Sequence, residues 1–195
     1  MLLKDKFRDK RIILGSASPR RKELLAGLDI PFTVEAFPGG SEEFDSCLPF
    51  EEIPKAIALA KSNNFHRELA ADEILITADT VVVCNGRILG KPNCPDDAFI
   101  TLKELSGKSH SVVTGVCIRS IDKIRSFSAV SDVLFDELSD EEIEYYISNY
   151  SPLDKAGSYG IQEWIGYVGI RSIHGSYFNI VGLPVQRLYK ELINF

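Results

Sequence analysis

One stretch of the chain, residues 74–92, constrains the fold more than any other. Its first half is apolar and rich in β-branched residues, which is the composition of a strand buried on both faces. Asn85 and Gly86 follow, and they suit a type I′ turn because both of its central residues must adopt positive φ. The stretch therefore predicts a buried strand and a tight hairpin, with Val83 paired with Ile88 or a near neighbour.

An acidic residue, Asp79, lies in the middle of this predicted buried strand. Burying a carboxylate costs free energy unless a partner neutralises it or the protein uses it. A hairpin that closes after the strand brings Lys91 back towards Asp79. From the strand alone, Asp79 is about equally well explained as half of a structural ion pair and as a functional acid.

The size and composition of the chain are those of an ordinary soluble globular protein. Its 195 residues can bury a core within one domain, so we expect a single domain over residues 1–195, with two lobes. Hydrophobic residues make up 45% of the chain and charged residues 26%, which is typical of that class. No run of about 18 apolar residues occurs, and the N-terminus lacks the apolar core of a signal peptide.

Charge and cysteine usage narrow the range of partners. The net charge of −6 argues against a general attraction to nucleic acid or to an acidic membrane. The four cysteines, Cys47, Cys84, Cys94 and Cys117, are far apart and form no CxxC motif. They therefore argue for reduced thiols in a cytoplasm and against a zinc site. We expect a cytoplasmic protein that binds neither nucleic acid nor membrane.

A second informative segment begins as a short strand over residues 11–16 and continues into a helix. Ser18 is a favourable N-cap, and Pro19 suits the first helical position. The free N–H groups and the dipole of a helix N-terminus favour an anion. Arg20 and Arg21 oppose that dipole, so they indicate either a solvated basic helix start or an anionic ligand. Of the two, we favour phosphate binding.

The remaining sequence mixes helix and strand patterns without strict βαβ regularity, which predicts an α/β fold with a mixed sheet flanked by helices. Neither GxGxxG nor the P-loop motif occurs. The predicted elements are a turn and strand over 29–34, a helix over 54–71, a helix from Pro95 that Gly107 closes, strands at 110–118 and 127–135, a helix after a capping box at Ser139, one or two short strands within 164–181 and a last helix from Pro184.

Polar residues at predicted strand ends, in helices and in loops form a set that suits a polyphosphate. Arginine grips phosphate oxygens bidentately, lysine acts as a point charge, and carboxylates hold Mg²⁺ or orient a water. The set fits nucleophilic catalysis poorly, since no GxSxG motif occurs. Its members are Ser16, Ser18, Arg20, Arg21, Glu43, Lys61, Asp79, Lys91 and Gln162.

Several motifs, in order from about Arg11 to Leu192, resemble those of the Maf family of nucleoside triphosphate pyrophosphatases. They are Ser18-Pro19-Arg20-Arg21-Lys22-Glu23-Leu24-Leu25, Ala78-Asp79-Thr80-Val81-Val82, Gly90-Lys91-Pro92, Leu105-Ser106-Gly107, Asp154-Lys155-Ala156-Gly157, and Gly175-Ser176-Tyr177 with Val181-Gly182-Leu183-Pro184. The resemblance implies a Maf/inosine-triphosphatase-like fold with two lobes around a cleft, and often a homodimer. It also implies cleavage between the α- and β-phosphates of a nucleotide, which gives the monophosphate and pyrophosphate with a divalent metal.

Within the family, Tyr159-Gly160-Ile161-Gln162 together with Thr80 resembles the branch that acts on dTTP and UTP. The branch that acts on methylated guanosine triphosphate usually has Gln at the position of Thr80. A Gln amide offers a donor and an acceptor, which can match the O4/N3–H edge shared by uracil and thymine. Two features depart from the branch: Glu163 stands where it usually has Gly, and the segment before Arg11 is longer.

The resemblance and the residue types together assign expected roles. Lys91 close to Asp79 should keep that acid ionised at neutral pH. Whether Asp79 is a general base or only a metal ligand stays open. We expect Ser16, Ser18, Arg20, Arg21, Lys61, Thr80, Lys91 and Gln162 to bind substrate, Glu43 and Asp79 to bind a divalent cation (Mg²⁺ or Mn²⁺), and Asp79 to activate or orient the attacking water.

Two other functions compete with hydrolysis. A non-enzymatic nucleotide-binding regulator of cell division is the first, because the family is also associated with arrest of division. The acid–base set of Glu43, Asp79 and Lys91 speaks for an enzyme, since binding alone needs no acid that activates water. A nucleotidyltransferase is the second, because such enzymes also use basic loops and metal-binding carboxylates.

Overall fold

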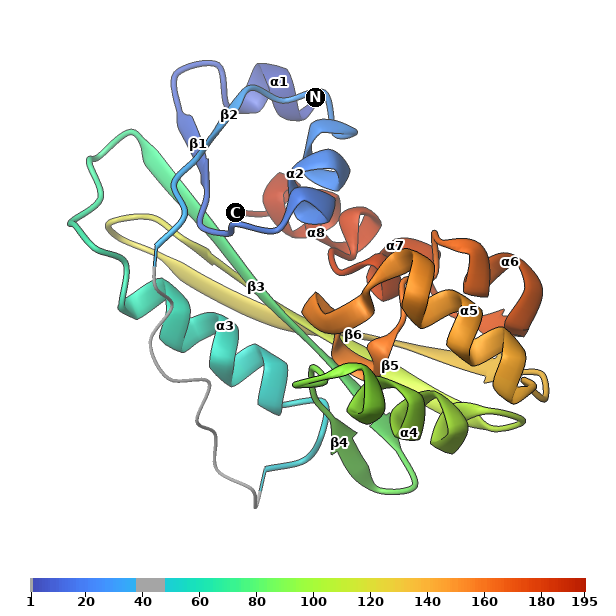
Figure 1. Ribbon diagram of the computed structural model, residues 1–195. Helices are drawn as coiled ribbons and strands as arrows, with labels where there is room; N and C mark the ends of the chain where they lie inside the picture. The colour runs from blue at the N-terminus through green and yellow to red at the C-terminus, as the bar shows by residue number, and fades with distance from the viewer. Residues whose placement is uncertain (1, 38–47) are drawn as a thin grey trace. The chain divides into compact units, whose positions relative to one another are not determined.

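The computed structural model describes residues 2–37 and 48–195, and over these residues the chain has an α/β fold with a mixed sheet (Figure 1). The strand order is β2-β1-β3-β5-β6-β7, with β4 paired to β3. The pairs β1–β2 and β1–β3 are parallel, whereas β3–β4 and β6–β7 are antiparallel. The elements are α1 Leu3–Lys6, β1 Arg11–Leu14, α2 Pro19–Ala26, β2 Phe32–Val34, α3 Ile53–Asn63, β3 Glu73–Cys84, β4 Arg87–Leu89, α4 Pro95–Leu105, β5 Ser109–Arg119, β6 Ile124–Phe135, α5 Asp140–Tyr150, the 3₁₀ turns η1 Pro152–Asp154 and η2 Ala156–Ser158, α6 Trp164–Gly169, β7 Ile170–His174, α7 Tyr177–Val181 and α8 Val185–Ile193.

The central hairpin forms as the sequence predicts. Strand β3 is buried along most of its length. Asn85 and Gly86 adopt φ angles of 50° and 71°, as a type I′ turn requires. Val83 pairs with Ile88, so the predicted register is confirmed.

The chain divides into two compact units, which confirms the prediction of two lobes. The first unit holds the described residues up to Asp79, together with 114–129 and 182–195; the second holds 80–113 and 130–181. The chain passes from one unit to the other within β3, within β5, within β6 and after α7. The predicted cleft and the single-domain description of residues 1–195 stay predictions.

Apolar side chains cover both faces of the sheet strands in the first unit. Leu14 and Ile76 pack with apolar residues of α2 and α8. Consecutive strand residues point to opposite faces, and Ile13 and Leu75 accordingly join a separate cluster with Phe65 and Leu69. The strands β1 and β3 are therefore buried on both faces, which explains their continuous apolar sequence.

The second unit has its own core. Val82 of β3, Val133 of β6 and residues of α4, α5 and α6 form one apolar cluster, to which Tyr146 and Ile165 belong. The capping box at Ser139 is present as predicted: its side chain accepts the N–H of Glu142, and the Glu142 side chain accepts the N–H of Ser139. Local signals therefore define the start of α5.

Three parts of the secondary structure differ from the prediction. Helix α3 ends at Asn63 rather than Ala71, because the Asn63-Asn64 pair is unfavourable inside a helix. The segment 164–181 contains α6 and α7 besides the single strand β7, and the glycines of α6 hide its helical signal. Helix α1 was not predicted, because its four residues are too few to show a helical period.

Candidate functional site

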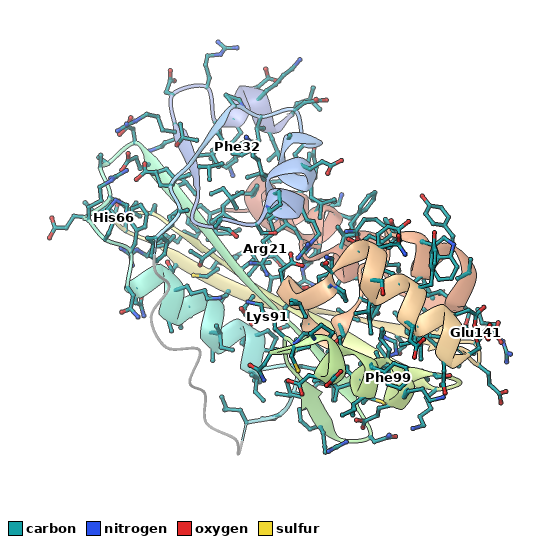
Figure 2. The ribbon with its side chains drawn as sticks, viewed as in Figure 1. Arg21, Phe32, His66, Lys91, Phe99 and Glu141 are labelled. Carbon is teal, nitrogen blue, oxygen red and sulfur yellow. The ribbon has the colours of Figure 1, made fainter. Side chains whose placement is uncertain are left out.

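The start of α2 in the first unit is built as the sequence predicts. The Ser18 side chain accepts the backbone N–H of Arg21 at 3.4 Å, and Pro19 is the first helical residue. Ser16 Oγ accepts the N–H of Ser18 at 3.3 Å and Nη1 of Arg21 at 3.4 Å. Nε of Arg21 donates to the carbonyl of Gly182 at 2.9 Å. These bonds fix the half-buried Arg21 (labelled in Figure 2) at a helix end that favours an anion.

Asp79 is buried and paired, but the partner that the structure shows is Lys61. Nζ of Lys61 lies 2.7 Å from Oδ1 of Asp79, and the side chains are only 17% and 12% exposed. Two residues earlier on the same face of β3, Thr77 Oγ1 donates to the carbonyl of Ala58 at 2.7 Å. The two contacts fix the position of α3 over this end of β3, so that the last turn of the helix neutralises the buried carboxylate.

The roles predicted for Glu43 and Lys91 beside Asp79 stay predictions. Glu43, the second predicted metal ligand, lies outside the described residues. The approach of Lys91 to Asp79 stays a prediction, because the two residues belong to different units. Within residues 2–37 and 48–195, no cluster of three or more histidine, cysteine, aspartate or glutamate side chains could hold a metal ion.

In the second unit, the segment before Lys91 contacts the loop that leads to the predicted base-binding turn. The N–H of Gly157 donates to the carbonyl of Gly90 at 3.1 Å. Gly157 has φ +69°, and a Cβ there would lie 2.9 Å from Cγ2 of Val82, so a side chain would be both strained and crowded. Thr80 lies two residues from Val82 and therefore shares its face of β3. The loop thus packs over the face that carries Thr80.

Gln162 is half-buried in the turn after Tyr159. Sequence reasoning missed the residues that hold this turn. It assigned no role in this turn to Tyr146, Lys155 or His110. In the structure the hydroxyl of Tyr146 bonds to Glu163, and the hydroxyl of Tyr159 bonds to His110. The one signal in the sequence was the residue type, because a buried tyrosine hydroxyl usually needs a hydrogen-bond partner.

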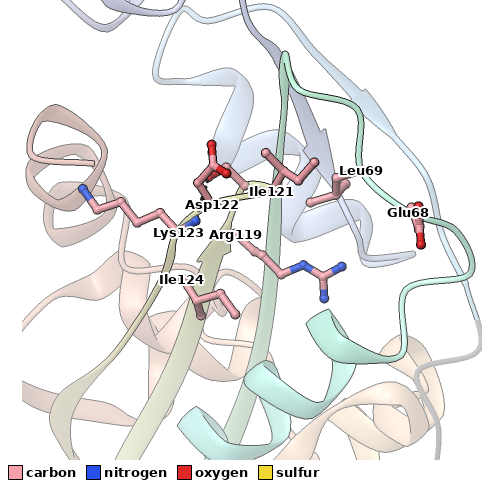
Figure 3. A pocket seen from close by; sticks show the side chains of 8 residues that line it. Glu68, Leu69, Arg119, Ile121, Asp122, Lys123 and Ile124 are labelled. Carbon is pink, nitrogen blue, oxygen red and sulfur yellow. Dashed lines mark hydrogen bonds between the residues drawn. The ribbon is translucent and has the colours of Figure 1, made fainter.

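A pocket of about 510 Å³ lies at the turn between β5 and β6 in the first unit and contains none of the predicted site residues (Figure 3). Arg119 donates there to the carbonyl of Ser62 at 2.6 Å, and Lys123 donates to the carbonyl of Phe195 at 2.7 Å. Both cations are thus engaged by backbone carbonyls. The lining residues are Glu68, Leu69, Arg119, Ser120, Ile121, Asp122, Lys123 and Ile124.

None of the described helices has the length and apolarity that a membrane crossing would require.

Known proteins resemble this chain over almost its whole length. A family described as "Maf-like protein" matches residues 11–195. A protein of Phocaeicola vulgatus named dTTP/UTP pyrophosphatase is 57% identical over 182 residues, which cover 93% of this chain and 94% of the relative. A protein of the same name from Porphyromonas gingivalis is 50% identical over 193 residues, which cover 98% of this chain and 97% of the relative. The solved structure of a HAM1 protein from Coxiella burnetii covers 95% of this chain and 100% of that chain, with 14% identity and a TM-score of 0.46.

Proposed function

The chain belongs to the Maf-like protein family, and we propose that it hydrolyses dTTP and UTP to the nucleoside monophosphate and pyrophosphate. The observation that carries this proposal is the 57% identity, over 93% of the chain, to a protein named dTTP/UTP pyrophosphatase. The geometry of the first unit agrees with it, since this unit offers an anion-binding helix start and a buried acid–lysine pair.

The start of α2 binds the phosphate tail in this proposal. Arg21 already donates through Nε and Nη1 to the protein, which holds its guanidinium in one orientation. Arg20 and the backbone N–H groups behind Ser18 share the same helix end. Charge-assisted contacts of this kind stabilise a triphosphate more than a monophosphate, because more charged oxygens are available.

Asp79 acts on the water that attacks the α-phosphorus. Its Oδ1 is engaged by Lys61, so Oδ2 is the atom that accepts the proton of the water. The new bond joins the water oxygen to the α-phosphorus, the bond between that phosphorus and the α–β bridging oxygen breaks, and pyrophosphate leaves. Lys61 and Lys91 offset the negative charge that gathers on the phosphates.

A divalent cation, Mg²⁺ or Mn²⁺, is part of the proposal, and Asp79 fits it. Mg²⁺ is usually bound by one or two carboxylates together with the phosphates of the substrate, so one buried carboxylate is a sufficient protein contribution. When bound, the ion would neutralise phosphate charge and polarise the phosphoryl oxygens. Glu43 stays a proposed second ligand. The homodimer and the cytoplasmic location are proposals that rest on the family resemblance and the separated cysteines.

A product assay tests the proposal. The purified chain is incubated with Mg²⁺ or Mn²⁺ and each of dTTP, UTP, CTP, ATP and GTP, with and without added inorganic pyrophosphatase. We expect dTMP and UMP to form, and phosphate to appear only when pyrophosphatase is present. Release of phosphate without pyrophosphatase would indicate cleavage at the γ-phosphate instead. Formation of a nucleotide sugar when a sugar phosphate is added would favour a nucleotidyltransferase, and binding without turnover would favour a regulator.

A further inference from the structure

The four-residue turn from Gly160 to Glu163 is closed by one tyrosine hydroxyl. The N–H of Gly160 donates to the hydroxyl of Tyr146 at 2.9 Å, and that hydroxyl donates to Oε2 of Glu163. The N–H of Glu163 donates to the carbonyl of Gly160 at 3.0 Å. The first and last residues of the turn are therefore joined both directly and through Tyr146, with Gln162 between them.

The second oxygen of the Glu163 carboxylate also has a partner. Nζ of Lys155 lies 3.2 Å from Oε1 of Glu163 and 2.8 Å from Oδ1 of Asp154. The Lys155 side chain is only 9% exposed. A carboxylate with one partner on each oxygen is held in a single orientation, so Glu163 is a fixed point rather than a mobile surface acid.

The supports of this turn are themselves rigid. Tyr146 is fully buried and stacks on Tyr150 with ring centroids 5.2 Å apart. Burial and the hydrogen bond to Glu163 raise the pKa of Tyr146, which keeps its hydroxyl protonated and able to donate. Immediately before the turn, the Tyr159 hydroxyl lies 2.7 Å from Nε2 of the buried His110.

The side chain of Gln162 is packed into the same arrangement. A Cβ at Gly160 would lie 2.8 Å from Cδ of Glu163 and 3.1 Å from Nε2 of Gln162. The amide nitrogen of Gln162 and the carboxylate of Glu163 therefore both border the space that a side chain at Gly160 would fill. A movement of Glu163 changes the space in which the amide lies.

The orientation of this amide decides which pyrimidine it matches. Uracil and thymine offer an acceptor at O4 and a donor at N3–H, whereas cytosine offers a donor at the amino group and an acceptor at N3. A Gln amide rotated by half a turn exchanges its donor and its acceptor. A freely rotating Gln162 would consequently suit cytosine as well as uracil, and only a fixed amide discriminates between them.

We propose that Tyr146 and Glu163 are positioning residues that hold Gln162 in the orientation that accepts uracil and thymine and rejects cytosine. This inference rests on the proposed function. It assigns to the pair an effect on base selectivity and none on the chemistry of the phosphates. Loss of the pair should therefore raise activity on CTP relative to UTP and leave the turnover of UTP nearly unchanged.

The test compares Tyr146→Phe, Glu163→Gln and the double variant with the wild type. For each protein, kcat and KM are measured for UTP and CTP, and Kd is measured for UMP and CMP. We expect the UTP-to-CTP ratio of kcat/KM to fall about three- to tenfold in each single variant, mainly through KM. The double variant should fall no further than the single variants, because the two residues act as one unit.

Tyr145→Phe is the matched control, because Tyr145 is the neighbouring residue on α5 and its side chain is exposed. Its ratio should equal that of the wild type. If the Tyr146→Phe and Glu163→Gln variants keep the wild-type ratios of kcat/KM and of Kd while their melting temperatures drop, the pair is only structural and the inference is wrong. A wild-type protein that hydrolyses neither UTP nor dTTP would instead overturn the proposed function. In that case, equal UMP-to-CMP Kd ratios in wild type and variants would overturn the inference as well.

Discussion

Lys61 and Asp79 are 18 positions apart in the sequence, yet their charged atoms lie 2.7 Å apart. The lysine comes from the last turn of α3 and the aspartate from the interior of β3. Because both side chains are largely buried, each charge lowers the free-energy cost of burying the other. The same pair supplies the acid and one of the cations of the proposed reaction.

The first prediction concerns the acid itself. Asp79→Asn keeps the shape of the side chain but removes the charge that the water and the cation require. We expect kcat for UTP to fall by about two to four orders of magnitude, with nucleotide binding largely retained. Steady-state kinetics and calorimetric titration with UMP measure the two effects. The exposed Asp96→Asn is the control, and an Asp79→Asn protein with near wild-type turnover would remove Asp79 from the mechanism.

The second prediction concerns the stability of the pair. Lys61→Met leaves the carboxylate of Asp79 buried without this cation, so unfolding should require about 2 kcal/mol less free energy than in the wild type. The double variant Lys61→Met with Asp79→Asn should recover part of that loss, because no unpaired charge remains. Urea denaturation of the four proteins measures the coupling. Simple additivity of the two single losses would argue against an energetic link.

The third prediction concerns the helix start. Arg20→Ala should weaken binding of UTP by about 1.5–3 kcal/mol, because one charge-assisted contact is lost, and should weaken binding of UMP much less. Titration of the Asp79→Asn background avoids turnover during the measurement. Lys22→Ala, an exposed change in the same helix, should affect neither ligand. Equal losses for UTP and UMP in Arg20→Ala would place Arg20 away from the phosphate tail.

The fourth prediction concerns the choice of substrate. We expect dTTP and UTP to exceed CTP and the purine triphosphates at least about tenfold in kcat/KM, because a mismatched base leaves buried polar groups unpaired. Gln162→Ala should reduce that preference. A Gln162→Ala protein that is less stable but still prefers UTP to the same extent would show that Gln162 stabilises the loop and does not select the base.

The fifth prediction concerns pH and stability. Burial lowers the pKa of His110 to about 4 from its ordinary 6.5, while the charge of Asp132 acts in the opposite direction. Between these values the unfolded chain binds the proton and the folded chain does not, so stability falls as pH drops from 6.5 towards 4. The difference of about 2.5 pH units corresponds to about 3 kcal/mol at pH 4.

Replacement of this histidine isolates its contribution from that of the carboxylates. His110→Phe should flatten the stability profile between pH 4.5 and 6.5 relative to the wild type, even if its stability at pH 7 is lower. His174→Asn, at a side chain that is 95% exposed, should keep the wild-type slope. Parallel profiles for wild type and His110→Phe, measured by urea denaturation, would contradict the prediction.

Features that depend on neighbouring residues could be predicted from the sequence. The hairpin follows from Asn85 and Gly86, whose φ requirements are local. The N-cap at Ser18 and the capping box at Ser139 are also local signals, and both are confirmed. The buried apolar strand correctly marked Asp79 as a residue that needs a partner.

Features that depend on distant contacts could not be predicted in the same way. The packing of α3 that brings Lys61 to Asp79 leaves no local pattern in the sequence, so this ion pair was not predicted. The bond between Tyr146 and Glu163 joins a helix to a turn 17 positions away. Helix α6 was missed because its glycines weaken the local pattern and packing compensates for them.

The chain crosses repeatedly between its two units, and this connectivity affects which properties can change together during evolution. Both ends of the chain belong to the first unit, and the second unit consists of two inserted segments, 80–113 and 130–181. Asp79 and the α2 arginines lie outside these inserts, whereas Thr80 and Gln162 lie inside them. Under the proposed roles, the inserts carry the base-contacting residues together with Lys91, so their exchange between related genes would transfer base preference along with one of the phosphate-binding cations.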